Sequence, residues 1–110
     1  MKGQYTKKFL KADGINIALI YLYMDKVLTS KKDVNFDRYQ SWFNKEGEFV
    51  YVVSHTPKSE FEEYHEVTML VNDTGIYVDG VKHDQLTKRY LENLEMFKNS
   101  IYTKNEVGLN

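Results

Sequence analysis

The chain has 110 residues, a formal net charge of −1 and no cysteine. The lack of cysteine excludes disulfide bonds and thiolate metal ligands, so a zinc site would need histidine and carboxylate side chains alone. A chain of this length is expected to bury about 65% of the surface that its unfolded form exposes. We therefore expect residues 1–110 to form a single domain, with a ragged lead-in at 1–12 and a frayed tail at 104–110.

The sequence predicts a cytoplasmic protein with no membrane partner. Its longest apolar run, Ile17 to Met24, has eight residues. A membrane span needs about 20. The residues before Asp13 contain lysines but no apolar stretch of the signal-peptide type. Abundant Lys, Asn, Tyr, Ile and Phe with one proline indicate AT-rich coding DNA, typical of a low-GC bacterium, its phages or its mobile elements.

The first ten residues predict a ragged lead-in or a short helix. In the helical alternative, Tyr5, Phe9 and Leu10 form a small apolar face, while neighbouring lysines remain in water.

The segment Asp13 to Ser30 predicts the central helix of the domain, with Asp13 as its N-cap. A buried strand is the alternative, but the length of the pattern favours a helix. One apolar stripe at helical spacing contains Ile17, Ile20, Tyr21, Met24, Val27 and Leu28. A second apolar face contains Ala18, Leu19, Leu22 and Tyr23. If the monomer leaves that second face open, we expect a homodimer to form there.

A short second helix is predicted from Phe36 to Asn44. Phe36, Tyr39 and Phe43 share one face at helical spacing, and Asn35 precedes them as a cap. In such a helix Trp42 lies off the stripe, beside Arg38 one turn earlier.

Beyond Gly47 the apolar period changes from helical to alternating, which predicts strands. Three segments form an antiparallel meander in this interpretation: Glu48 to Ser54, the later part of Glu60 to Asn72, and Ile76 to Val78. Turns are predicted at the sequence Asn72-Asp73-Thr74-Gly75 and again at Asp79-Gly80.

The last element is predicted to be an amphipathic helix capped by Asp84. Its apolar stripe contains Leu86, Tyr90, Leu91, Leu94, Phe97 and Ile101. The predicted fold class is therefore α+β, in which a three-stranded antiparallel meander packs on the central helix and the C-terminal helix. The short aromatic helix would lie at one edge.

Charge is unevenly distributed along the chain. Residues 1–45 carry nine basic and four acidic residues, whereas residues 46–66 carry six acidic residues and one lysine. Such blocks usually become solvated faces that the fold intermingles. The sharper hypothesis is a bipolar surface that steers partners or favours head-to-tail self-association.

The sequence contains no recognisable catalytic or metal-binding pattern. His65-Glu66 and His83-Asp84 are adjacent pairs, but neighbouring strand residues such as His65 and Glu66 point to opposite faces. Paired-acid, nucleophile-elbow and phosphate-cradling glycine motifs are absent. We therefore expect a protein that is not an enzyme and uses no cofactor or metal.

The aromatic content favours protein binding. Nine tyrosines, six phenylalanines and one tryptophan are more rings than a core of this size needs, and exposed Tyr and Trp are typical of interface hot spots. The candidate partner-binding residues fall in two segments: Arg38, Tyr39 and Trp42, and then Glu60, Phe61, Glu62, Glu63 and Tyr64. The second segment combines rings with carboxylates and suits a basic site on a partner, including the nucleic-acid channel of an enzyme.

The leading hypothesis is a small phage or mobile-element protein that inhibits or modulates a host protein in the host cytoplasm. Two alternatives stay open. The first is nucleic-acid binding by the basic N-terminal half, although the chain has only two arginines. The second is an oligomer that binds a nucleotide-like ligand between subunits through tyrosine stacking and lysines.

Overall fold

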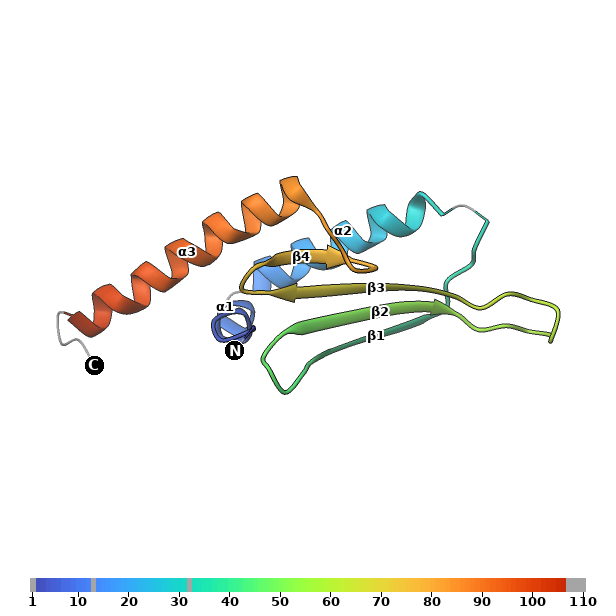
Figure 1. Cartoon of the computed structure of the whole chain (residues 1–110), viewed down its shortest axis with the longest axis horizontal. Helices are drawn as coiled ribbons and strands as arrows, with labels where there is room; N and C mark the ends of the chain where they lie inside the picture. The colour runs from blue at the N-terminus through green and yellow to red at the C-terminus, as the bar shows by residue number, and fades with distance from the viewer. Residues whose placement is uncertain (1, 13, 32, 107–110) are drawn as a thin grey trace.

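In the computed structural model, three helices lie against one side of an antiparallel sheet (Figure 1). The structure describes residues 2–12, 14–31 and 33–106. The helices are α1 (Thr6–Ala12), α2 (Gly14–Thr29) and α3 (Asp84–Glu106). The strands are β1 (Arg38–Phe43), β2 (Phe49–His55), β3 (His65–Asn72), β4 (Gly75–Val78) and β5 (Val81–Lys82). The predicted α+β class is confirmed.

The sheet is larger than predicted. Among the described residues it has five strands in the order β1-β2-β3-β4-β5, each antiparallel to its neighbours. The prediction of a three-stranded meander was therefore wrong, because it omitted one strand at each edge. The three predicted strands are the central ones, β2, β3 and β4.

The short helix predicted from Phe36 to Asn44 is instead strand β1, so this prediction was wrong. Its six residues alternate between two faces and pair with β2 in register, from Arg38 opposite Ser54 to Phe43 opposite Phe49. This pairing satisfies backbone groups on β2 that would otherwise form an open edge. Aromatic residues also suit a strand well, so tertiary pairing outweighs the weak helical spacing.

Two glycine turns set the hairpins at the edges. Between β1 and β2, Gly47 has φ 81° and donates its N–H to the carbonyl of Asn44 (3.0 Å). Between β4 and β5, Asp79 and Gly80 both have positive φ, 50° and 81°. Positive φ at both central residues is the geometry of a tight type I′ hairpin turn, and it returns the chain as β5.

The core lies between the sheet and the helices. The main stripe of α2 is confirmed, since Ile20 and Met24 are buried against the sheet and the rest of the stripe is partly buried around them. The inward residues of the three central strands complete this core: Phe49, Tyr51, Val53, Val67, Met69, Val71, Ile76 and Val78. From α3, Tyr90 and Leu94 close it. The predicted cap residue, Asp13, lies outside the described residues.

The N-terminal segment is tied to the β3–β4 turn through Asp73. The carboxylate of Asp73 accepts hydrogen bonds from the backbone N–H of Tyr5 (3.0 Å) and of Thr6 (2.8 Å), at the start of α1, where N–H groups have no acceptor within the helix. It also accepts from the hydroxyl of Thr6 (2.7 Å), and that hydroxyl accepts from Tyr90 of α3 (3.0 Å). One side chain therefore joins α1, the sheet and α3.

The same segment passes close to the β1–β2 turn. A Cβ atom on Gly3 would lie 2.2 Å from the carbonyl carbon of Gly47, so only glycine fits there. The N–H of Gly3 donates to the carbonyl of Glu46 (3.0 Å). Phe9 and Leu10, which follow in α1, are buried in the core.

We expect Asp73→Ala to destabilise the protein by about 1–3 kcal/mol, because it removes the cap of α1 and leaves the buried Thr6 hydroxyl without its acceptor. Urea unfolding measures this loss. A matched Asp33→Ala variant changes an exposed aspartate and should alter the unfolding free energy by less than about 0.5 kcal/mol. Equal effects of the two substitutions would contradict the assigned role of Asp73.

Candidate functional site

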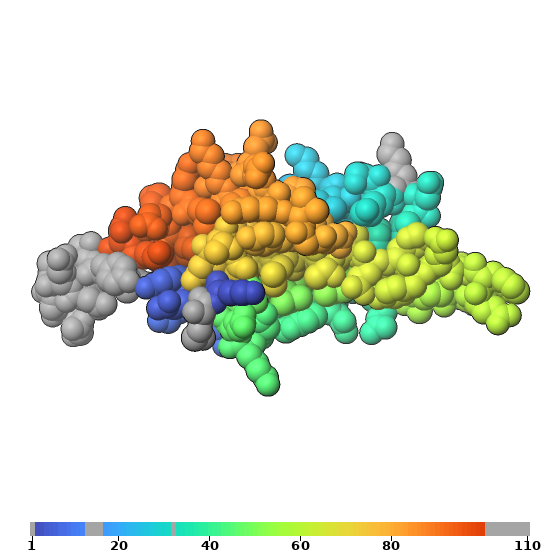
Figure 2. Space-filling view, viewed as in Figure 1, coloured from blue at the N-terminus to red at the C-terminus, as the bar shows by residue number. Residues whose placement is uncertain are grey.

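The loop between β2 and β3 is the most prominent surface feature of the molecule. It projects past the end of α2 and forms the tip of the molecule on one side (Figures 1 and 2). Phe61, in this loop, is 88% exposed, the highest value among the large apolar side chains of the described residues. Glu60, Glu62 and Glu63 are exposed around it. The predicted acidic and aromatic segment is therefore fully accessible.

Internal hydrogen bonds hold the loop in one conformation. The Glu62 carboxylate accepts from the backbone N–H of Lys58 (2.6 Å) and lies 3.4 Å from Nε2 of His55. The Ser59 hydroxyl accepts from the N–H of Phe61 (3.3 Å). These bonds use Glu62 as an anchor and turn Phe61 outward. A ring presented by an ordered loop loses less conformational entropy on binding than one on a flexible segment.

The base of the loop is fastened to the start of β1. Asp37 accepts a hydrogen bond from the N–H of Thr56 (2.8 Å), and the carbonyl of Asn35 lies 2.7 Å from Nδ1 of His55. The backbone hydrogen bond from Thr56 lowers the pKa of the Asp37 carboxyl. In the same way, the hydrogen bond from Lys58 lowers the pKa of Glu62. Both contacts are therefore stronger when the carboxylate is ionised.

The other predicted segment lies on β1 and is exposed throughout. Tyr39 is 56% exposed and Trp42 is 46% exposed. Residues directly opposite in an antiparallel pair share a face, so Trp42 lies with Val50 on the face away from the helices. Tyr39 lies opposite the buried Val53 on the helix side.

The structure separates two residues that the helical prediction placed side by side. On a strand, Arg38 and Trp42 share a face but lie about 13 Å apart along the chain direction. The positive charge of Arg38 acts instead on Tyr64, where it favours ionisation of the Tyr64 phenol. The hydrogen bond from Tyr64 to Glu66 (2.5 Å) outweighs this effect and raises the pKa of Tyr64.

Among the side chains that the structure describes, which end at residue 100, the four exposed aromatic ones are all members of the predicted binding set. They are Tyr39, Trp42, Phe61 and Tyr64. The exposure of Trp42 agrees with its predicted place off the aromatic stripe, whereas Tyr39 was predicted to lie on that stripe. The sequence did not reveal that these four rings are divided between one edge strand and one loop.

The histidines do not assemble a catalytic or metal centre in the part of the chain that the structure describes. His55 and His65 lie opposite each other on β2 and β3, with ring centroids 6.4 Å apart. Each has its own glutamate, Glu62 for His55 and Glu63 for His65, the second at 4.0 Å. Within the described residues, no group of three or more such side chains converges on a point that could hold a metal ion.

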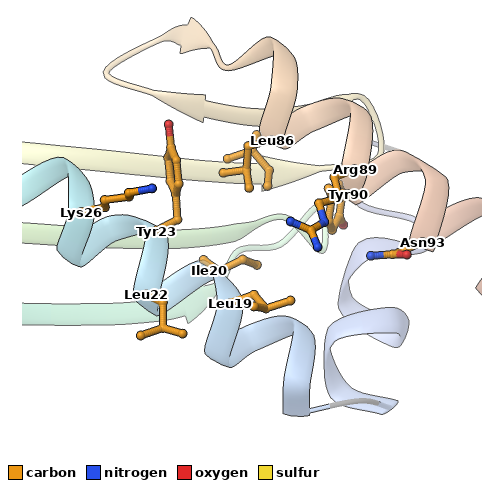
Figure 3. A pocket seen from close by; sticks show the side chains of 10 residues that line it. Leu19, Ile20, Leu22, Tyr23, Lys26, Leu86, Arg89, Tyr90 and Asn93 are labelled. Atoms are coloured by element: carbon orange, nitrogen blue, oxygen red, sulfur yellow. The ribbon is translucent and has the colours of Figure 1, made fainter.

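A second candidate surface is the groove between α2 and α3 (Figure 3). Its volume is about 220 Å³, and its walls are largely apolar. Leu19 and Leu22 from the second face of α2 stand along one wall and are 49% and 63% exposed. Lys26 and Arg89 border it, and Arg89 extends from α3 toward α2 (Figure 3).

The groove includes residues that the binding prediction omitted, namely Lys26, Leu86 and Arg89. They come from helices about 60 positions apart, so their meeting depends on the fold. One sequence signal did point here, since the second face of α2 was predicted to need a partner. In the described structure Ala18, Leu19 and Leu22 of that face are exposed, and Tyr23 is half-buried with its hydroxyl 2.5 Å from Nδ1 of His83.

Comparisons with protein-family models, with curated proteins and with solved structures find no match for this chain. No helix in the described ranges combines the length and apolar content that crossing a bilayer requires.

We expect the loop to lose its anchor in acid. The folded pKa of Glu62 lies below its ordinary value of 4.5, so the contact with Lys58 is complete above that pH and is lost as the pH falls through the lowered value. NMR of the Lys58 amide should show a transition with a midpoint below 4.5.

In Glu62→Gln this transition of the Lys58 amide should vanish, because the amide side chain does not ionise. The Thr56 amide should still titrate, since its acceptor is Asp37. A Lys58 transition that persists in Glu62→Gln would show that another group holds the loop.

Proposed function

We propose that this protein is a small, non-enzymatic binding module that engages another protein through the β2–β3 loop. The observation that carries the proposal is Phe61, an 88% exposed ring on an internally hydrogen-bonded loop. Burying an exposed aromatic ring is a large favourable contribution at an interface, and ordered anchors of this kind are typical of hot spots.

The charge around Phe61 defines the partner. Glu60 and Glu63 are exposed on either side of the ring, while Glu62 is engaged within the loop. The complementary surface is an apolar pocket bordered by lysine or arginine, as in the nucleic-acid channel of an enzyme. Carboxylates at the rim would mainly accelerate association and select the partner, whereas the ring would supply affinity.

The biological setting in the proposal is the cytoplasm of a low-GC bacterium, where a phage or mobile element would use this protein to inhibit or modulate a host protein. The small size of the chain and its residue usage support that setting. The exposed aromatic rings of the β2–β3 loop support binding as the activity.

Affinity capture from a low-GC bacterial lysate tests the proposal, with the tag at the C-terminus because Gly3 is packed against the β1–β2 turn. We expect one protein to be recovered in stoichiometric amount. Phe61→Ser should weaken its binding by about tenfold or more, the usual loss at a hot spot. Val81→Ser is the matched control, because Val81 is 66% exposed at the opposite edge of the sheet, and it should retain the partner.

A second measurement uses the charges. Glu60→Lys/Glu63→Lys should reduce the association rate with the purified partner and its dependence on salt, with the folding stability unchanged. Equal capture by wild type and both sets of variants would exclude the loop as the contact. Recovery of no protein, together with DNA binding that falls steeply with salt, would favour the nucleic-acid alternative. A thermal shift induced by nucleotides would favour the ligand-binding alternative.

A further inference from the structure

Strand β1 leaves a row of backbone groups without a strand beside it in the described chain. The N–H of Asn44 donates to the carbonyl of Glu48 (2.9 Å), which identifies these two residues as a hydrogen-bonded pair. Because the direction of the backbone groups alternates along a strand, Tyr39, Ser41 and Phe43 turn theirs away from β2. In Figure 1 no other element is drawn beyond β1 on that side. The outward groups are therefore available to another strand.

The edge lacks the features that usually prevent such pairing. β1 contains no proline, pairs with β2 without a bulge, and has one charged residue, Arg38. Its first five residues are exposed, although the hydroxyl of Ser41 contacts that of Tyr21 on α2 (2.8 Å). Edges that must stay single are normally short, bulged, charged or covered. This edge instead has the properties of an interaction strand.

The sequence of β1 is complementary to itself when two copies run antiparallel. If Gln40 pairs with its own copy on a two-fold axis, Tyr39 lies opposite Ser41 and Arg38 lies opposite Trp42. The Tyr39–Ser41 pairs are then the hydrogen-bonded ones, in agreement with the outward direction of their backbone groups. The Arg38–Trp42 pairs are non-hydrogen-bonded, the geometry in which side chains approach most closely.

This register provides favourable contacts on the face of the seam that points away from the helices, where Arg38, Gln40 and Trp42 lie. A guanidinium across from an indole ring gives a cation–π contact, and symmetry supplies it twice. The two Gln40 amides face each other and are able to hydrogen-bond. The two arginines are separated by several residues along the seam and do not oppose each other.

We propose that β1 pairs with β1 of a second copy in this register, so that two sheets join into one continuous sheet about a two-fold axis at Gln40. An isologous interface of this kind closes on itself and gives a dimer. The contact is small because one strand from each copy forms it, so dissociation at roughly micromolar concentration is expected. The inference does not require the proposed function, since the loop that carries Phe61 lies outside the seam.

The groove on α2 and α3 is a weaker candidate for the seat of a second copy. Its only charged lining residues are the cations Lys26 and Arg89. A two-fold contact there would bring two sets of like charges together. No such repulsion arises at β1, where each charged residue meets a ring.

Sedimentation velocity of the purified protein from about 1 µM to 1 mM tests the proposal. We expect the wild type to move from the 13.0 kDa monomer to twice that mass as concentration rises. Ser41→Pro removes an outward N–H but none that β2 uses, and proline is tolerated at an edge. It should raise the dissociation constant at least tenfold with an unchanged circular dichroism spectrum.

Ser41→Ala is the matched control. It loses the contact of the Ser41 hydroxyl with Tyr21 (2.8 Å), as the proline variant does, but keeps the N–H. This variant should dimerise like the wild type. If both variants lose the dimer, the hydroxyl and not the strand edge is responsible, and the proposal is wrong.

The register has its own test. Trp42→Lys places a lysine opposite Arg38 and should abolish the dimer, while the double variant Arg38→Glu/Trp42→Lys places opposite charges there and should restore it. Failure of the double variant to recover would overturn the register. A wild type that stays monomeric throughout, or a dimer that survives Ser41→Pro and is lost in Leu22→Glu, would overturn the pairing of β1 altogether.

Discussion

The structure depends on the hydrogen bonds that the Asp73 carboxylate makes with the start of α1. Without a partner, the first N–H groups of that short helix and the buried Thr6 hydroxyl would face the interior unsatisfied. Asp73 meets these donors from a turn 67 positions away and, through Thr6, reaches Tyr90 of α3. Burial raises the pKa of Tyr90, so this phenol remains a neutral donor at physiological pH.

This network determines where the rest of the molecule lies. With α1 fixed at one end of the sheet, Phe9 and Leu10 fill the core between α3 and the sheet. The helices then cover the middle of the sheet, while the first five residues of β1 stay exposed and the β2–β3 loop projects beyond the end of α2 (Figure 1). The aromatic rings on β1 and on the loop are exposed as a result, because the helices that pack on the sheet do not extend over them.

Local periodicity was sufficient to predict the elements that pack against each other. The apolar stripe of α2 and the apolar alternation in β2 and β3 each indicate a buried face. The predictions of a helix and of two strands in these segments were correct. β1 was mistaken for a helix because three aromatic residues fit helical spacing by chance, and nothing local reveals that β2 needs a neighbour. β5 was missed because two residues carry no periodic signal, although Asp79-Gly80 is a strong hairpin turn. The contact between Asp73 and Thr6 is long-range, and no local pattern contains it.

The two edges of the sheet differ, and the difference limits how the protein can aggregate. β5 has only two residues and turns at once into α3, so it offers little template for a further strand. Growth of the sheet in that direction is blocked, and addition is confined to β1. If only the β1 edge can pair with another strand, pairing stops once two copies have joined. The sheet then cannot extend into a fibre, even at the high protein concentrations reached during strong expression.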